Sequence, residues 1–97
     1  MQVEIVEPAA FGLRTLNSDD QQNVHAWVGH LKNWDNDPIV RKHSLKLPSW
    51  ENTYVLHAGP ELRLFFTKEG EKIEVFDIAK RSVLLAAFGQ TSGTNGP

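Results

Sequence analysis

The segment YVLHAGPELRLFFTKEGEKIEVFDIAKR, residues 54–81, says most about the fold of this chain. Three runs within it, YVLH, LRLFFT and KIEVFDI, are rich in the β-branched and aromatic residues that favour strands. The connections AGPE and KEGE separate the runs, and each contains the glycine that a tight hairpin turn needs. The segment therefore predicts a three-stranded antiparallel meander.

Shorter elements precede the meander. VEIV, residues 3–6, is a strand candidate, and PAAFGLRTL, residues 8–16, predicts a short helix. A longer helix is predicted from Ser18, because apolar residues then recur at helical spacing as far as residue 34. Ser18 and Gln21 have the spacing of a capping box, and Pro38 cannot continue the helix.

Two further segments, one before and one after the meander, have different compositions. Residues 36–53 contain turn-forming sequences and a basic centre, RKHSLK, and we expect them to form a loop. SVLLAAF, residues 82–88, fits either a last strand or a short helix. We expect one domain over residues 1–88 and a disordered, polar and glycine-rich tail over residues 89–97.

The order of these elements predicts an α+β fold. An N-terminal strand and two helices come before consecutive strands, which favours an antiparallel sheet with the helix pair packed on one face. The other face of the sheet is then open to solvent or to a partner.

Composition narrows the classes of function. The 97-residue chain has a net charge of −2, which argues against a surface that tracks phosphate throughout, so a nucleic-acid site would need a local basic patch. The chain contains no cysteine, which excludes disulfides and thiolate metal sites, and we expect no metal or other cofactor. No apolar run reaches the roughly 18 residues of a membrane span and the first residues lack signal-peptide features, so we expect a cytoplasmic protein.

Arg63 lies inside the most apolar run of the chain. Side chains alternate in a strand, so Leu62 and Leu64 share one face, whereas Arg63 and Phe65 share the other. If the helices cover the leucine face, Arg63 lies on the open face, where its guanidinium could bind a phosphate with two hydrogen bonds. The spacing also allows the alternative of an ion pair with Glu74, close to the expected cross-strand position.

The element order, the arginine just after the start of a strand and the basic residues of IAKR resemble the RelE/ParE superfamily of bacterial toxins from type II toxin–antitoxin systems. The resemblance runs from about residue 3 to about residue 85 and is strongest over residues 54–81. It implies the α+β fold described above and a cognate antitoxin as partner. In the RelE branch, the toxin enters the ribosomal A site and cleaves mRNA without a metal, as the 2′-hydroxyl attacks the adjacent phosphate and leaves a 2′,3′-cyclic phosphate.

The resemblance also implies roles for individual residues. Arg63, with Lys80 or Arg81, would stabilise the phosphorane charge, and His43 would transfer a proton because histidine titrates near neutral pH. Basic side chains would hold RNA phosphates and aromatic ones would stack on bases. The implied RNA contacts are Arg41, Lys42, Lys46, Tyr54 and Phe65.

Two departures from the family pattern leave the target open. Many active members carry a tyrosine or a His-Tyr pair near the end, but residues 82–88 contain neither, and this chain lacks the usual basic balance. The ParE branch inhibits DNA gyrase without the nuclease residues. The alternatives are therefore a toxin with a protein target such as gyrase, or a non-catalytic partner-binding member of the fold. His57 could face the site or cap a turn.

Overall fold

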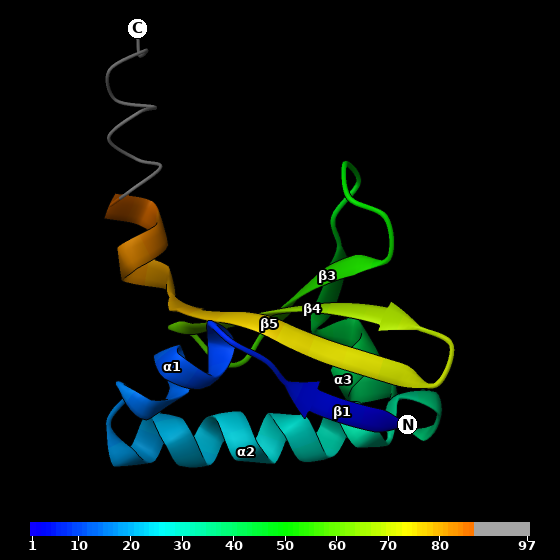
Figure 1. Cartoon of the computed structure of the whole chain (residues 1–97), viewed down its shortest axis with the longest axis horizontal. Helices are drawn as coiled ribbons and strands as arrows, with labels where there is room; N and C mark the ends of the chain where they lie inside the picture. Colours follow the sequence, from blue (N-terminus) through cyan, green and yellow to red (C-terminus); the bar gives the residue numbers. More distant parts are fainter. Residues whose placement is uncertain (87–97) are drawn as a thin grey trace, which may run out of the picture.

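A computed structural model describes residues 1–86 as a five-stranded mixed sheet with helices on one face (Figure 1). The strands are β1 (Gln2–Ile5), β2 (Ser44–Lys46), β3 (Thr53–His57), β4 (Leu62–Glu69) and β5 (Lys72–Lys80). The helices are α1 (Ala9–Arg14), α2 (Ser18–Lys32), the 3-10 helix η1 (Trp34–Asn36) and α3 (Pro38–Lys42), and residues 81–86 are also helical. The strand order is β1-β5-β4-β3-β2, with β1 parallel to β5 and the other neighbours antiparallel.

The meander predicted from residues 54–81 is confirmed as β3, β4 and β5. Gly59 and Gly70 adopt φ angles of +100° and +59°, which lie in the region that glycine tolerates best. These two residues lie in the connections between the three strands. The turn chemistry of the sequence therefore sets the order of the central strands.

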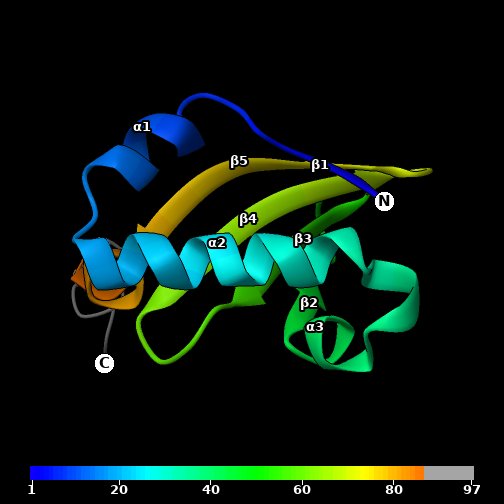
Figure 2. The ribbon, with the colours of Figure 1, turned by 90° about the horizontal axis from the view of Figure 1, so that it is seen from below.

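Helices α1, α2 and α3 cover one face of the sheet, and α2 runs beneath its length (Figure 2). The core lies between α2 and the sheet, and the predicted α+β class with helices on one face is confirmed. Its buried apolar residues are Ala9, Val24, Leu31, Val40, Leu56, Ala58, Leu62, Leu64, Phe66, Ile73, Val75 and Ile78. Within residues 1–86, no helix combines the length and apolar character that crossing a membrane would require.

The start of α2 differs from the prediction by one residue. Asn17, not Ser18, is the N-cap, and its side-chain oxygen accepts a hydrogen bond of 2.8 Å from the backbone N–H of Asp20. Ser18 is the first residue of the helix. Asparagine and serine are almost equally good caps, so propensity alone does not choose between neighbours.

The prediction of a loop over residues 36–53 is wrong in two places, because residues 38–42 form α3 and residues 44–46 form β2. Asp37 caps α3 by accepting hydrogen bonds from the N–H groups of Ile39 and Val40, and Pro38 occupies the first turn, where its missing N–H costs nothing. Asp37 also accepts a 2.6 Å hydrogen bond from His30, which keeps the pKa of the Asp37 carboxyl below its usual value. These contacts attach α3 to the end of α2.

The structure describes only part of the region to which the C-terminal predictions apply. The pattern of SVLLAAF fits either a strand or a helix, and residues 82–86 of it are helical. The predicted tail over residues 89–97 and the domain boundary at residue 88 lie outside the described residues.

Candidate functional site

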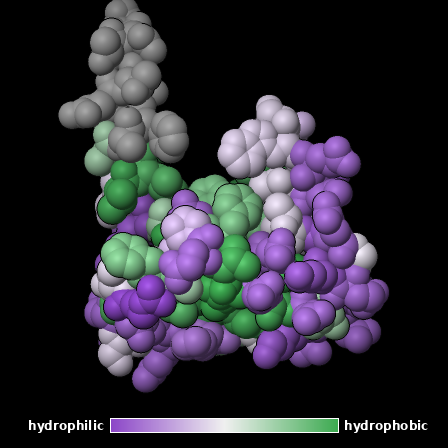
Figure 3. Space-filling view, in the orientation of Figure 1, coloured by the Kyte–Doolittle hydropathy of each residue, from purple (hydrophilic) through white to green (hydrophobic). Residues whose placement is uncertain are grey.

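The uncovered face of the sheet carries a groove between two projections. The loop of residues 47–52 rises on one side, and helical residues 81–86 rise on the other (Figure 1). The surface is hollowed between these projections, with hydrophobic residues at the floor (Figure 3). The groove has a volume of about 300 Å³ and is lined by Leu47, Trp50, Phe65, Phe76, Asp77 and Leu84.

A β-bulge shapes the floor of this groove. Phe65 is opposite Asp77 and Phe66 is opposite Val75, so Phe76 is an extra residue on β5. The bulge interrupts the alternation of side chains, because two residues on one strand oppose one on the other. It allows Phe76 and Asp77, which are adjacent in sequence, to line the same groove.

Arg63 lies on this open face, as predicted. It is opposite His57 on β3 and Ala79 on β5. Its Nη1 donates hydrogen bonds to the carbonyl oxygens of Gly59 and Leu62 at 3.0 and 2.9 Å, which hold the guanidinium at the β3–β4 turn. The Nε–H and Nη2 donors form no hydrogen bond within residues 1–86, so an anion could engage them.

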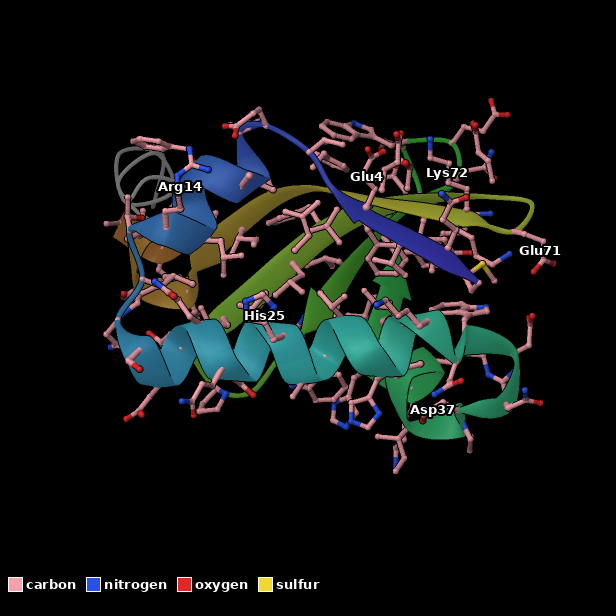
Figure 4. The ribbon with its side chains drawn as sticks, turned by 60° about the horizontal axis from the view of Figure 1, so that its bottom comes forward. Glu4, Arg14, His25, Asp37, Glu71 and Lys72 are labelled. Carbon is pink, nitrogen blue, oxygen red and sulfur yellow. The ribbon has the colours of Figure 1, made fainter. Side chains whose placement is uncertain are left out.

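The alternative of an Arg63–Glu74 ion pair is not observed. Glu74 is opposite Thr67 and forms its ion pair with Lys72 at 3.4 Å. Lys72 also contacts Glu4 of β1 at 3.7 Å, and Figure 4 shows these two side chains near each other. The two carboxylates raise the pKa of Lys72, the Glu74 hydrogen bond contributing most. Within residues 1–86, Arg63 forms no ion pair.

His57 is the site residue that sequence reasoning did not select. It is the cross-strand neighbour of Arg63, so the two side chains share the open face. Burial lowers the pKa of the imidazole below its usual value, and the positive charges of Arg63 and His43 lower it further. His57 is therefore mainly neutral at physiological pH. The only sequence signal was its position at the end of the strand that pairs with the Arg63 strand.

Lys80 and Arg81, the predicted second cations, separate onto different parts of the molecule. Lys80 is opposite the buried Leu62 and forms an ion pair with Asp20 of α2 at 3.2 Å. Its side chain therefore lies on the helix-covered face, away from Arg63. Arg81 is exposed at the start of the last helical segment, and its backbone N–H donates to the Glu61 carbonyl.

The predicted basic residues also lie away from Arg63, whereas His43 is a neighbour of His57, whose backbone N–H donates to the His43 carbonyl at 2.9 Å. Arg41 and Lys42 belong to α3, on the helix-covered side (Figure 2). Lys46 is opposite Tyr54 and so shares that face. The His43 ring packs edge-on against Trp27 of α2, with ring centroids 5.4 Å apart. These four residues gather around α3 and β2, not around the groove.

The two predicted base-stacking residues have different surroundings. Tyr54 stacks on Phe66 with centroids 5.2 Å apart and also contacts Trp34 edge-on, so its ring is part of the core packing. Phe65 lines the groove and lies 6.3 Å from the ring of Phe76. Of the two, only Phe65 offers a surface on the Arg63 face.

Comparisons with known proteins agree on the fold. No family model and no curated protein matches this sequence. A chain of the archaeal RelE–RelB complex from Pyrococcus horikoshii OT3 superposes with a TM-score of 0.66 at 16% identity, covering 82% of this chain and 93% of that chain. YafQ from E. coli strain BL21(DE3) superposes with a TM-score of 0.65 at 16% identity, covering 86% and 96%.

A third solved structure extends the likeness. A copper-bound mutant toxin from Helicobacter pylori has a TM-score of 0.58 at 14% identity, covering 87% of this chain and 98% of that chain. The chain thus has the fold of the RelE-like toxins, as the sequence resemblance predicted. At these identities, the likeness concerns the fold.

Proposed function

We propose that this protein is the toxin of a type II toxin–antitoxin system and cleaves mRNA on the ribosome without a metal. The observation that carries the proposal is the pairing of Arg63 and His57 on the open face of a RelE-like fold. The guanidinium has no carboxylate partner within residues 1–86, and the imidazole has a lowered pKa. A free cation beside a neutral base suits transesterification of RNA.

In the proposed reaction, neutral His57 accepts the proton of a ribose 2′-hydroxyl. The 2′-oxygen forms a bond to the adjacent phosphorus, and the bond from phosphorus to the 5′-oxygen breaks. The Nε–H and Nη2 donors of Arg63 bind the non-bridging oxygens as negative charge develops on them. The departing 5′-oxygen takes a proton from water, and the products are a 2′,3′-cyclic phosphate and a 5′-hydroxyl.

The proposed partners use different surfaces. The ribosome would bind through Arg41, Lys42 and Lys46, whose positive charges gather around α3 and β2, separate from the groove. Arg81 would contact RNA at the rim of the open face, beside the end of β5. The solved RelE–RelB complex supports the proposal of a cognate antitoxin. Because mRNA and ribosomes are the targets, we propose that the protein acts in the cytoplasm.

The second candidate is a toxin that binds a protein such as DNA gyrase. The apolar lining of the groove favours it, because Leu47, Trp50 and Leu84 could receive apolar side chains of a partner. This mode of action needs neither the Arg63 guanidinium nor the His57 imidazole.

Induced expression in bacterial cells separates the two candidates, with growth and mRNA 5′ ends measured together. Wild-type protein is expected to arrest growth and produce new 5′ ends, and both effects are expected to disappear with Arg63→Ala. Glu74→Gln is the matched control. It removes a charge from the neighbouring strand β5, and this charge pairs with Lys72, not with Arg63. Growth arrest without new 5′ ends, retained in Arg63→Ala, would overturn the nuclease proposal and support a protein target.

A further inference from the structure

We infer that the groove binds one RNA base beside the phosphate at Arg63, and that Asp77 makes this subsite selective for guanine. The inference rests on the proposed RNA-cleaving function and adds the feature of RNA that the site reads. Three observations carry it: the separation of two opposite charges, the aromatic surface beside Asp77, and the acceptor chemistry of a carboxylate.

Asp77 and Arg63 share the open face but do not form an ion pair. Asp77 is opposite Phe65, and Ala79 is opposite Arg63, so the two charged residues are diagonal neighbours about 7 Å apart at Cβ. That distance is within reach of a long arginine side chain. Instead, Arg63 donates to carbonyls at the β3–β4 turn, and Asp77 Oδ1 accepts a 2.9 Å hydrogen bond from the N–H of Ile78.

The backbone therefore holds a cation and an anion side by side without neutralising either. A matching ligand carries a negative group and, a short distance away, N–H donors. A nucleotide has this arrangement, because its phosphate is anionic and its base bears donors. A cationic segment of a protein would suit Asp77 but would be repelled by Arg63, so charge complementarity favours the nucleotide.

The surface beside Asp77 suits a flat base. Phe65 and Phe76 form a bent aromatic floor with rings tilted by 43°, and exposed Trp50 stands on the loop at its side. Bases stack favourably on such rings whatever their sequence. The groove volume of about 300 Å³ is at the lower limit of ligand pockets, which is adequate for a single base.

The spacing fits one nucleotide. Arg63 and Phe65 are two residues apart on one face of β4, which corresponds to about 7 Å along the strand. A ribose bridges a comparable span between a phosphate and its base. A phosphate held by Arg63 therefore places the attached base over Phe65, with its edge directed to Asp77 on the opposite strand.

The carboxylate selects among bases because it only accepts hydrogen bonds when ionised. Guanine presents two adjacent donors, N1–H and the N2 amino group, which match the two oxygens of one carboxylate. Adenine and cytosine each present one amino group next to a ring nitrogen that repels the carboxylate, and uracil presents one N–H between two carbonyl groups. Discrimination by such bidentate contacts is roughly 5- to 150-fold.

The test measures binding without cleavage. Fluorescently labelled 2′-O-methyl RNAs, UUGUU, UUAUU, UUCUU and UUUUU, are titrated with the purified protein at low salt, and fluorescence anisotropy gives each Kd. The methyl group removes the attacking hydroxyl. We expect UUGUU to bind at least fivefold more tightly than the other three, and Asp77→Asn to abolish this preference.

Two variants serve as controls for the Asp77 result. Glu74→Gln removes a carboxylate from the same strand and is expected to keep the guanine preference. Arg63→Ala is expected to weaken the binding of all four RNAs alike, because the Arg63 side chain contacts phosphate, which every RNA carries. Asparagine retains an oxygen that can accept from the Ile78 N–H, and thermal unfolding checks that Asp77→Asn folds.

Equal binding of the four RNAs, binding of none, or a guanine preference that survives Asp77→Asn would each overturn the inference. Preferential binding of a lysine-rich peptide at the groove, without RNA binding, would also overturn it in favour of a protein partner. A guanine preference that is lost in Asp77→Asn supports the inference, even if expression produces no new mRNA ends. The absence of new mRNA ends would refute the nuclease function alone. New mRNA ends without base preference would leave that function standing and refute the subsite.

Discussion

Phe65 and Phe66 are adjacent in sequence but lie on opposite faces of one sheet. Phe66 is fully buried beneath the helices and contacts the rings of Tyr54 and Trp34. Phe65 is only half-buried and lines the open groove. Because side chains alternate along a strand, one segment supplies both a core and a surface for a ligand.

The same contrast extends to charge. Lys80, on the helix-covered face, is paired with Asp20 and helps to attach β5 to α2. Arg63, on the open face, donates to carbonyl oxygens of its own hairpin and has no carboxylate partner in the part of the chain that the structure describes. The covered face thus uses its polar groups for structure, whereas the open face keeps some available.

The largest effect on stability is expected for Phe66→Ala. Removing a buried phenylalanine leaves a cavity and should lower the free energy of unfolding by about 3–5 kcal/mol. The matched change Phe65→Ala should cost about 1 kcal/mol or less, because this ring is only partly removed from water. Urea unfolding of both variants measures the difference. Equal losses would contradict the assignment of the two faces.

Arg63→Ala should have the opposite profile. It is expected to reduce the rate of mRNA cleavage roughly 100- to 1000-fold, as loss of one stabilising donor does elsewhere. The urea midpoint should remain close to that of wild type. Cleavage rates in a purified translation reaction, measured beside those of Glu74→Gln, check this. If Arg63→Ala lowered the urea midpoint but left the cleavage rate of the folded protein unchanged, the role of Arg63 would be structural.

A smaller effect separates the two candidate caps of α2. Asn17→Ala should lower the free energy of unfolding by about 1 kcal/mol, because it removes the acceptor for the Asp20 N–H. Ser18→Ala should change it by only a few tenths of that amount. Thermal unfolding of the two variants side by side measures the difference. A larger destabilisation by Ser18→Ala would support Ser18 as the N-cap instead.

The smallest effect is the pH dependence contributed by His57. Its pKa in the folded protein lies below the reference value of 6.5, so the unfolded chain binds a proton more readily. Stability should therefore decrease as the pH falls below about 6.5, and this component should be absent from His57→Gln. Urea unfolding between pH 5 and 8 measures the difference between the two proteins. A difference that grows in favour of wild type at low pH would contradict a lowered pKa.

Much of the fold followed from local patterns. Alternation placed Arg63 on the open face, and two glycine-containing turns gave the order of three strands. Alternation failed at the bulge, because nothing in the sequence around Phe76 marks it as an inserted residue. Extending the alternation through β5 without a bulge would have assigned Ile78 to the exposed side, whereas it is buried with Val75.

The site was harder to predict because it depends on register. Glu74 could be proposed as a partner for Arg63 only by assuming a turn length, and the observed register puts Ala79 there instead. His57 and Arg63 are brought together by the same pairing, which residue types alone do not reveal. The basic surroundings of His43 favour a role in the site, but His43 directly follows the short helix α3, which the turn-rich sequence does not predict, and its ring packs against Trp27.

In the proposed function, the open face cleaves RNA through Arg63 and His57. The most direct test is to determine the termini of mRNA cut in a purified translation reaction with wild type, Arg63→Ala, His57→Gln and the control Glu74→Gln. We expect 2′,3′-cyclic phosphate and 5′-hydroxyl termini with wild type and Glu74→Gln, and almost no cleavage with the other two. Undiminished cleavage by both Arg63→Ala and His57→Gln, or arrest of translation with intact mRNA, would contradict it.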